Sequence, residues 1–262
     1  MTDKHQQLTD AYKAIAEVLD RHGITYFAAF GTAIGAVRHS GIIPWDDDLD
    51  IAILAKDLDE VNRVLSEELD PERFYYHNPS ADSHPHVVIR TDDFEETLRN
   101  REAAFIDIFI LLDYPDSILR RGLMYPFIGF DLLPNKVLDS TESGVVKALF
   151  YGIMHVSRKL CRLFSTEKTS RYNIRAVEVR RYSWEKADFG TPVLHDFEDT
   201  VIPIPENYHK ILTEFYGDYM TPPPEGQRSG ATGYPYSLYN DYLEDQGRRK
   251  KHSRLSQDVL PR

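Results

Sequence analysis

The stretch GTAIGAVRHSGIIPWDDDLDIAI, residues 31–53, places a cluster of acids at the entrance to an apolar segment. Four of the five residues from Asp46 to Asp50 are acids, and a solvated turn would tolerate such a run. The residues that follow are almost uniformly apolar, which indicates a buried strand instead. Because side chains two apart on a strand share a face, Asp48 and Asp50 point into the same space. Two carboxylates so close need a cation, and their oxygen atoms favour Mg²⁺ or Mn²⁺.

Alternating helical and strand patterns surround this segment. Apolar residues at helical spacing predict helices over residues 8–19 and 58–65, and β-prone runs predict strands at 25–30, 74–76, 86–90 and 104–112. This mixture indicates an α/β or α+β domain that ends near Asp113. Beyond it, helical patterns at 117–125, 145–164 and 207–216 predict a mainly helical second half.

Asp107 adds a third carboxylate in the strand FIDIFILLD, residues 105–113, where an unpaired acid would be costly to bury. If this strand lies beside the one that carries Asp48 and Asp50, three carboxylates converge. Such a set can hold divalent ions and place a base near an attacking hydroxyl. The turn at Gly31 and Thr32, just before a short helix, offers backbone amides for phosphates. A strand-end charge with no ligand is the alternative for Asp107.

The motif pattern resembles the LicD family of the nucleotidyltransferase fold superfamily, which is related to the fukutin group. The matching positions are Gly31, Thr32, Gly35, Arg38, His39, Gly41, Pro44, Trp45, Asp46, Asp47, Asp48 and Asp50. FIDIF resembles the family's later carboxylate strand, and residues 197–228 resemble its C-terminal motif. The match is weakest over residues 117–180.

This resemblance implies an α+β fold with a nucleotidyltransferase-like mixed sheet. The catalytic core would span residues 1–113, and a mainly helical lobe, residues 114–262, would complete the LicD-type domain. The implied reaction moves a phospho-alcohol, above all phosphocholine, from a CDP-linked donor to a sugar hydroxyl of a cell-surface glycan or its lipid-linked precursor. Relatives use ribitol phosphate. Lipopolysaccharide biosynthesis is one setting that the resemblance implies.

The same resemblance assigns roles to individual residues. It places Mg²⁺ or Mn²⁺ on Asp48, Asp50 and Asp107, with Asp46 joining through water, and it allows Asp107 to act as the base as well. Arg38 would lie near the leaving nucleotide or form a structural ion pair. Trp45 would stack on the cytosine or simply pack, and His39 is expected to be a hydrogen-bond donor in a loop.

Composition limits the partners. Acids outnumber bases by 42 to 31, for a net charge of −11, so binding to a nucleic-acid backbone is not expected. With no signal pattern at the N-terminus and a single cysteine, Cys161, the sequence predicts a cytoplasmic protein. The helix over 145–164 carries bases beside an apolar face and would either pack in the core or lie on the inner face of an anionic membrane. The tail is rich in tyrosine at residues 233–242 and basic at residues 248–254. It is expected to be a loosely ordered, solvated end, and the alternative is that it stacks a substrate and holds phosphates.

Two other functions stay open at this point. The same three acids would serve nucleotidyl transfer, in which the nucleotide moves to an acceptor and pyrophosphate leaves. A noncatalytic protein that binds glycans in such a pathway is the third reading.

Overall fold

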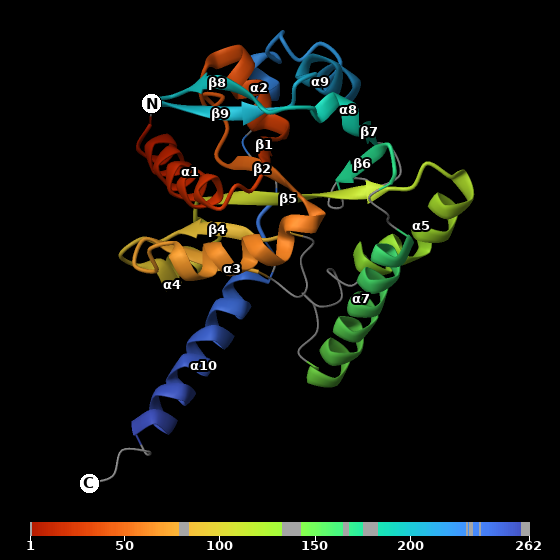
Figure 1. The fold of residues 1–262 in the computed structure, drawn as a ribbon. Coiled ribbons are helices and arrows are strands. Elements are labelled where there is room, and N and C mark those ends of the chain that lie inside the picture. Colours follow the sequence, from red (N-terminus) through yellow and green to blue (C-terminus); the bar gives the residue numbers. More distant parts are fainter. Residues whose placement is uncertain are drawn as a thin grey trace.

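The computed structural model describes residues 2–78, 84–132, 143–164, 168–174, 183–228, 230, 233–235 and 237–257. Its centre is a curled mixed sheet with helices packed around it (Figure 1). The α+β class with a mixed sheet, predicted from the sequence, is confirmed. The strands of this sheet are β1 (Tyr26–Ala28), β2 (Leu49–Leu54), β3 (Phe74–His77), β4 (His86–Ile89), β5 (Phe105–Tyr114), β6 (Arg171–Ile174) and β7 (Trp184–Glu185).

The strand order explains how distant acids meet. Along the main path of the sheet the order is β1-β2-β5-β4-β3, while β6 pairs with the far end of β5 and β7 pairs with β6. The β2–β5 pair is parallel and the other described pairs in this sheet are antiparallel. Both central strands are almost entirely buried, which is why they read as continuous apolar runs. They therefore form a rigid platform for the few polar residues that they carry.

Helices α1 (Asp3–Arg21), α2 (Phe30–His39), α3 (Leu58–Glu68) and α4 (Phe94–Arg99) belong to the same half of the chain. In α1 the residues Leu8, Ile15 and Leu19 recur at helical spacing and are fully buried, so the amphipathic pattern packs against the sheet. Thr2 caps this helix by accepting a hydrogen bond from the backbone amide of His5 (3.1 Å). Gly23, with φ of +64°, lets the chain turn back toward β1.

The second half contributes more than helices. Its elements are α5 (Ile118–Leu132), α7 (Gly144–Phe164), α8 (Lys186–Phe189), β8 (Val193–Phe197), β9 (Thr200–Ile204), α9 (Tyr208–Tyr216) and α10 (Leu238–Gln257). Two short helical turns, η1 (Ala55–Asp57) and η2 (Glu225–Gln227), complete the set. The β8–β9 hairpin and the strands β6 and β7 were not foreseen from the sequence. The division of the chain at residue 113 stays a prediction.

The C-terminal segment differs from the expectation of a loosely ordered end. Helix α10 starts at Leu238, which is fully buried against Tyr75, Phe94 and Phe105. Its first turns pack on α4 and β3, and the helix then extends away from the sheet (Figure 1). Tyr239 and Tyr242, in the first turns of the helix, pack against the same cluster. Their apolar surface anchors the start of the helix, although the residues further along it are basic. The side chains of the basic run, residues 248–254, lie outside the described part.

Helices α5 and α7 lie side by side at the edge of the molecule (Figure 1). They pack on each other through Met124 and Cys161, which are buried, so the cysteine is a packed thiol. Among the described residues, no helix combines the length and the apolar character needed to cross a bilayer.

Candidate active site

Three carboxylates converge where β2 and β5 run side by side. Asp50 on β2 and Asp107 on β5 are direct register partners. Asp48, just before β2, brings a carboxylate oxygen to the same place, and one oxygen from each of the three acids lies within 4.8 Å of the others. Because β2 and β5 are neighbours in the sheet, the three carboxylates converge as the sequence predicts.

Burial and mutual repulsion make this cluster reluctant to ionise. Burial, followed by the charges of Asp46, Asp107 and Asp47, raises the pKa of Asp48 to about 8. Burial, followed by the same kind of repulsion, raises the pKa of Asp50 well above its ordinary value. Carboxyl groups whose pKa is raised by their neighbours are the sites where a cation gains the most, because it removes the repulsion.

The turn from β1 into α2 holds the acids in place. The backbone amide of Ala29 donates to the carbonyl of Asp50 (2.9 Å), and the amide of Asp50 donates to the hydroxyl of Thr32 (2.7 Å). Phe30, at the start of α2, has a φ of 43°, a left-handed conformation that is unfavourable for a side chain of this size. Thr32 is 3% exposed and serves as a partner of Asp50. The expected phosphate role of the turn remains a prediction.

Two glycines permit close approaches around the acidic loop. A Cβ on Gly31 would lie 2.7 Å from an oxygen of the Asp46 carboxylate. A Cβ on Gly35 would lie 2.5 Å from the carbonyl oxygen of Gly41. Neither position can carry a larger residue without moving its neighbour. The glycine spacing in the motif thus brings α2 against the loop that carries the acids.

Asp46 and Asp47 sit on the N-terminal side of the cluster. The carbonyl of Asp46 lies 3.0 Å from Nε2 of His5, and burial raises the pKa of its carboxyl group. Asp47 forms an ion pair with Lys4 (3.4 Å), and its carboxylate lies beside Gly230, where an added Cβ would be 2.8 Å from Oδ1. The side chain of Lys4 on α1 therefore partly neutralises Asp47, whereas no ion pair forms at Asp48 or Asp50 within the described part of the chain.

A group of histidines lies behind Asp107, and sequence reasoning missed it. Nε2 of His84 and Nε2 of His86 each lie 3.2 Å from Oδ1 of Asp107. Nδ1 of His86 lies 3.2 Å from Nδ1 of His77, whose Nε2 lies 2.8 Å from the carboxylate of Asp241 on α10. Burial, followed by the neighbouring histidines, lowers the pKa of His86 well below its ordinary value. The alternating HPH at residues 84–86 was the available signal, because it opens a strand beside β5.

Arg38 and His39 lie in the last turn of α2, so His39 is on a helix and not in a loop as predicted, and Trp45 lies in the turn that follows the helix. Arg38 donates to the carbonyl of Tyr219 and contacts Nδ1 of His39 (3.4 Å), and within the described residues it forms no ion pair. Burial, then the charge of Arg38, lowers the pKa of His39. His39 belongs to none of the metal-capable groups found among the described residues. The half-buried ring of Trp45 packs against the core, and the guanidinium of Arg228 lies 4.6 Å from its centroid.

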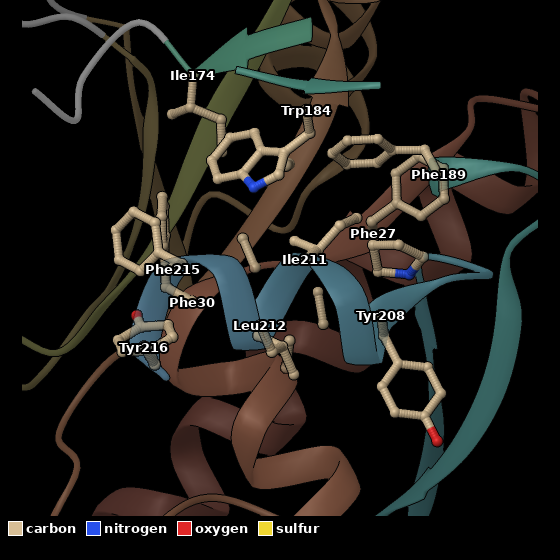
Figure 2. Close-up of a pocket in the computed structure, with 15 residues that line it drawn as sticks. Phe27, Phe30, Ile174, Trp184, Phe189, Tyr208, Ile211, Leu212, Phe215 and Tyr216 are labelled. Atoms are coloured by element: carbon tan, nitrogen blue, oxygen red, sulfur yellow. The ribbon is translucent and has the colours of Figure 1, made fainter. Parts of the chain in front are cut away.

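Tyr216 links the acids to an apolar pocket. Burial, then the charges of Asp50, Asp46 and Asp48, raises the pKa of its hydroxyl group, which places the residue in the field of the cluster. Figure 2 shows Tyr216 at one end of a pocket lined by aromatic side chains from β1, α2, β7, α8 and α9, including Phe27, Trp184 and Phe215. The pocket has a volume of about 30 Å³, which suits a water molecule and is far too small for a nucleobase. The aromatic side chains that line it thus pack α9 against the sheet.

Comparison with known protein families identifies the part of the chain that carries the three acids. A family model described as "LicD/FKTN/FKRP, nucleotidyltransferase domain" matches residues 23–126, which include all three converging acids. Residues 23–126 belong to the LicD family. The resemblance noted in the sequence is confirmed, and so is the class of the protein, a LicD-type phosphotransferase.

Relatives of this LicD domain differ in how much of the chain they share. The lipopolysaccharide cholinephosphotransferase LicD of Haemophilus influenzae is 26% identical over 275 residues, covering 93% of this chain and 98% of its own. An uncharacterized protein, RP689, of Rickettsia prowazekii is 44% identical over 62 residues, covering 24% of this chain and 23% of its own. The human ribitol 5-phosphate transferase FKRP is 24% identical over 137 residues, covering 47% of this chain and 28% of its own.

A crystal structure of ANT(2″)-Ia in complex with adenylyl-2″-tobramycin also matches. It is 11% identical, with a TM-score of 0.27, and the match covers 61% of this chain and 97% of that chain.

Proposed function

We propose that the protein transfers a phospho-alcohol group, above all phosphocholine, from a CDP-linked donor to a sugar hydroxyl of a cell-surface glycan or its lipid-linked precursor. The observation that carries this proposal is the convergence of Asp48, Asp50 and Asp107 inside a LicD domain. The cholinephosphotransferase relative, which aligns over nearly its whole length, supports phosphocholine over ribitol phosphate. Relatedness to FKRP keeps the second alcohol as the first alternative to test.

The residues present fit Mg²⁺ or Mn²⁺. All three offer carboxylate oxygens, the ligands that such hard cations prefer, and burial and mutual repulsion raise the pKa of Asp48 and of Asp50, which a bound cation would reverse. Asp48, Asp50 and Asp107 would hold the ion. When bound, it supplies charge neutralisation for the diphosphate of the donor.

The chain itself supplies alignment, proton transfer and charge. Asp107 would accept the proton of the sugar hydroxyl, since it is the acid of the three that the histidine group holds from behind. Arg38 is anchored through the carbonyl of Tyr219 and pairs with no acid among the described residues, so its charge is available for the leaving nucleotide. Trp45 already stacks with Arg228, and a cytosine would have to share or replace that contact.

The α5–α7 hairpin supports contact with an anionic membrane, where a lipid-linked acceptor would be found. Helix α7 contains Lys147, Arg158, Lys159 and Arg162 and no acidic residue. One side of it leaves apolar residues exposed: Val145 (82%), Leu149 (62%), Val156 (56%) and Leu163 (70%). Exposed apolar residues on a basic helix match the chemistry of an anionic bilayer surface better than that of a protein core.

Product analysis tests the reaction. With CDP-choline and the glycan acceptor, release of CMP together with a phosphocholine-modified glycan is the expected result. Pyrophosphate release from a nucleoside triphosphate would establish nucleotidyl transfer, and glycan binding without either product would establish a noncatalytic role. Chelation should abolish turnover, and added Mg²⁺ or Mn²⁺ should restore it. Undiminished turnover after chelation contradicts the metal assignment.

Vesicle sedimentation tests the membrane contact. The protein should bind vesicles that contain phosphatidylglycerol more tightly than vesicles of phosphatidylcholine alone. Leu149→Glu should weaken this binding. Leu194→Glu is the matched control, because Leu194 is 65% exposed on β8 and lies outside the hairpin. Equal binding by the two variants would show that α7 does not make the contact.

A further inference from the structure

The histidine group behind Asp107 has the composition and spacing of a metal site. His84, His86 and Asp107 each bring one ligand atom within 4.8 Å of those of the other two, and Nε2 of each histidine is 3.2 Å from Oδ1 of Asp107. In a tetrahedral site with metal–ligand distances of about 2.0–2.1 Å, neighbouring ligand atoms are about 3.3 Å apart. We propose that His84, His86 and Asp107 form a second metal site, for a borderline cation of the Zn²⁺ class, that shares Asp107 with the acid cluster.

The hydrogen bonds behind His86 set the tautomer that a metal requires. The carboxylate of Asp241 accepts from Nε2 of His77, so Nδ1 of a neutral His77 is an acceptor. Nδ1 of His86 then donates to it (3.2 Å), which leaves the lone pair of Nε2 directed at Asp107. Two acceptors that face each other in this way call for a cation between them. Metal-ligating histidines typically have this arrangement, with the second nitrogen held by a chain that ends in a carboxylate.

His84 is held by a different contact. Its ring stacks on Phe109, with centroids 4.3 Å apart and an interplanar angle of 29°, which fixes the direction of Nε2. The side chain of His84 is 11% exposed and that of His86 only 2%. The site is therefore built mainly from buried, oriented side chains, and His84 gives it the route to solvent.

This ligand set differs from the acid cluster in the cation that it selects. Two imidazoles and one carboxylate suit Zn²⁺, whereas three carboxylates suit Mg²⁺ or Mn²⁺. Three protein ligands leave a fourth tetrahedral position for a water or a substrate oxygen. Activation of the acceptor hydroxyl at that position would rest on the proposed function, whereas metal binding does not.

Co²⁺ is the probe that tests the site, because tetrahedral Co²⁺ absorbs visible light and Mg²⁺ does not. The full-length protein, stripped of metal and kept in excess Mg²⁺, should bind about one tetrahedral Co²⁺ per chain, and Zn²⁺ should displace it. His84→Gln and His86→Gln should each abolish the absorption. Asp48→Asn should keep it, since Asp48 belongs only to the acid cluster. Asp241→Asn should weaken binding by about 10- to 100-fold through the histidine chain.

His22→Gln is the matched control, because His22 also faces a carboxylate, Glu68 at 2.6 Å, but on the surface. It should leave the Co²⁺ spectrum unchanged. Thermal unfolding checks each variant, and if His86→Gln does not fold, the partly exposed His84 decides the question. Absence of the tetrahedral spectrum in the wild-type protein, or an unchanged spectrum in His84→Gln, overturns the proposal. Neither donor nor acceptor enters the measurement, so this result is independent of the proposed transfer reaction.

Discussion

Asp50 and Asp107 are register partners on the parallel strands β2 and β5, and the backbone thereby fixes the distance between their carboxylates. Loops could drift apart when the charges repel, but paired central strands cannot. The repulsion is therefore retained in the folded protein as a raised pKa, and it is relieved when a cation binds. The first three predictions follow from this relationship.

Asp48→Asn and Asp50→Asn should each reduce kcat/KM by at least about 10²-fold, because several kcal/mol of charge stabilisation depend on the metal. Each substitution keeps the size of the side chain and removes one charge, so the metal-free variants should unfold at a higher temperature than the wild type. Calorimetric titration with Mn²⁺ and thermal unfolding measure the two effects. Near-normal rates in both variants would eliminate these acids as ligands.

Asp47→Asn should cost much less activity than Asp48→Asn. Asp47 is held by Lys4 and lies beside Gly230. Among the described residues its carboxylate groups with Asp46 and Asp48, but not with Asp50 and Asp107. Steady-state rates at saturating metal compare the two variants directly. Equal losses would mean that Asp47 also reaches the metal.

The metal-free protein should become less stable as pH rises from about 4 to about 8. The pKa of Asp48 is about 8 in the folded protein and near 3.8 in the unfolded chain, so between these values the folded state binds more protons. The free energy of unfolding then decreases with increasing pH. Thermal unfolding across this range should show the fall, Mg²⁺ should reverse it most strongly at the alkaline end, and Asp48→Asn should flatten it. A rise in stability over the same range would contradict the raised pKa.

Asp107→Asn separates two roles of one carboxylate. As a base, Asp107 contributes about 10²- to 10⁴-fold to transfer onto a sugar hydroxyl, so that reaction should stay low at saturating metal while calorimetry still shows donor and metal binding. Hydrolysis of the donor by water is the internal comparison and should recover better. If excess metal restores transfer in full, Asp107 is a ligand alone.

Gly35→Ala should destabilise the protein by about 1–3 kcal/mol, because its Cβ would lie 2.5 Å from the backbone oxygen of Gly41 and neither backbone can yield freely. Gly152→Ala is the matched control on α7, where nothing lies within 4 Å of the added Cβ. There the better helix propensity of alanine should stabilise by up to about 1 kcal/mol. Chemical denaturation measures both, and equal effects would show that the close approach at Gly35 is not rigid.

The acid cluster could be predicted because its signal is local and strong. Alternation at residues 48–50 and the apolar run of β5 place the carboxylates on buried strands, and the family resemblance supplies the pairing between those strands. His84, His86 and Asp241 were not found in this way, since the alternation HPH at residues 84–86 indicates a strand but does not show that its neighbour in the sheet carries Asp107. Short strands such as β6 and β7 were not predicted for a similar reason. Their stability comes from pairing with β5 and not from their own few residues.

The contact between His77 and Asp241 joins residues that are 164 positions apart. A chain emerging from the ribosome exposes β3, β4 and β5 long before the segment that becomes α10 is translated. Until then His77 lacks the carboxylate that orients it. The chain of contacts from Asp107 through His86 and His77 to Asp241 is thus completed late in synthesis, when most of the protein has already been made.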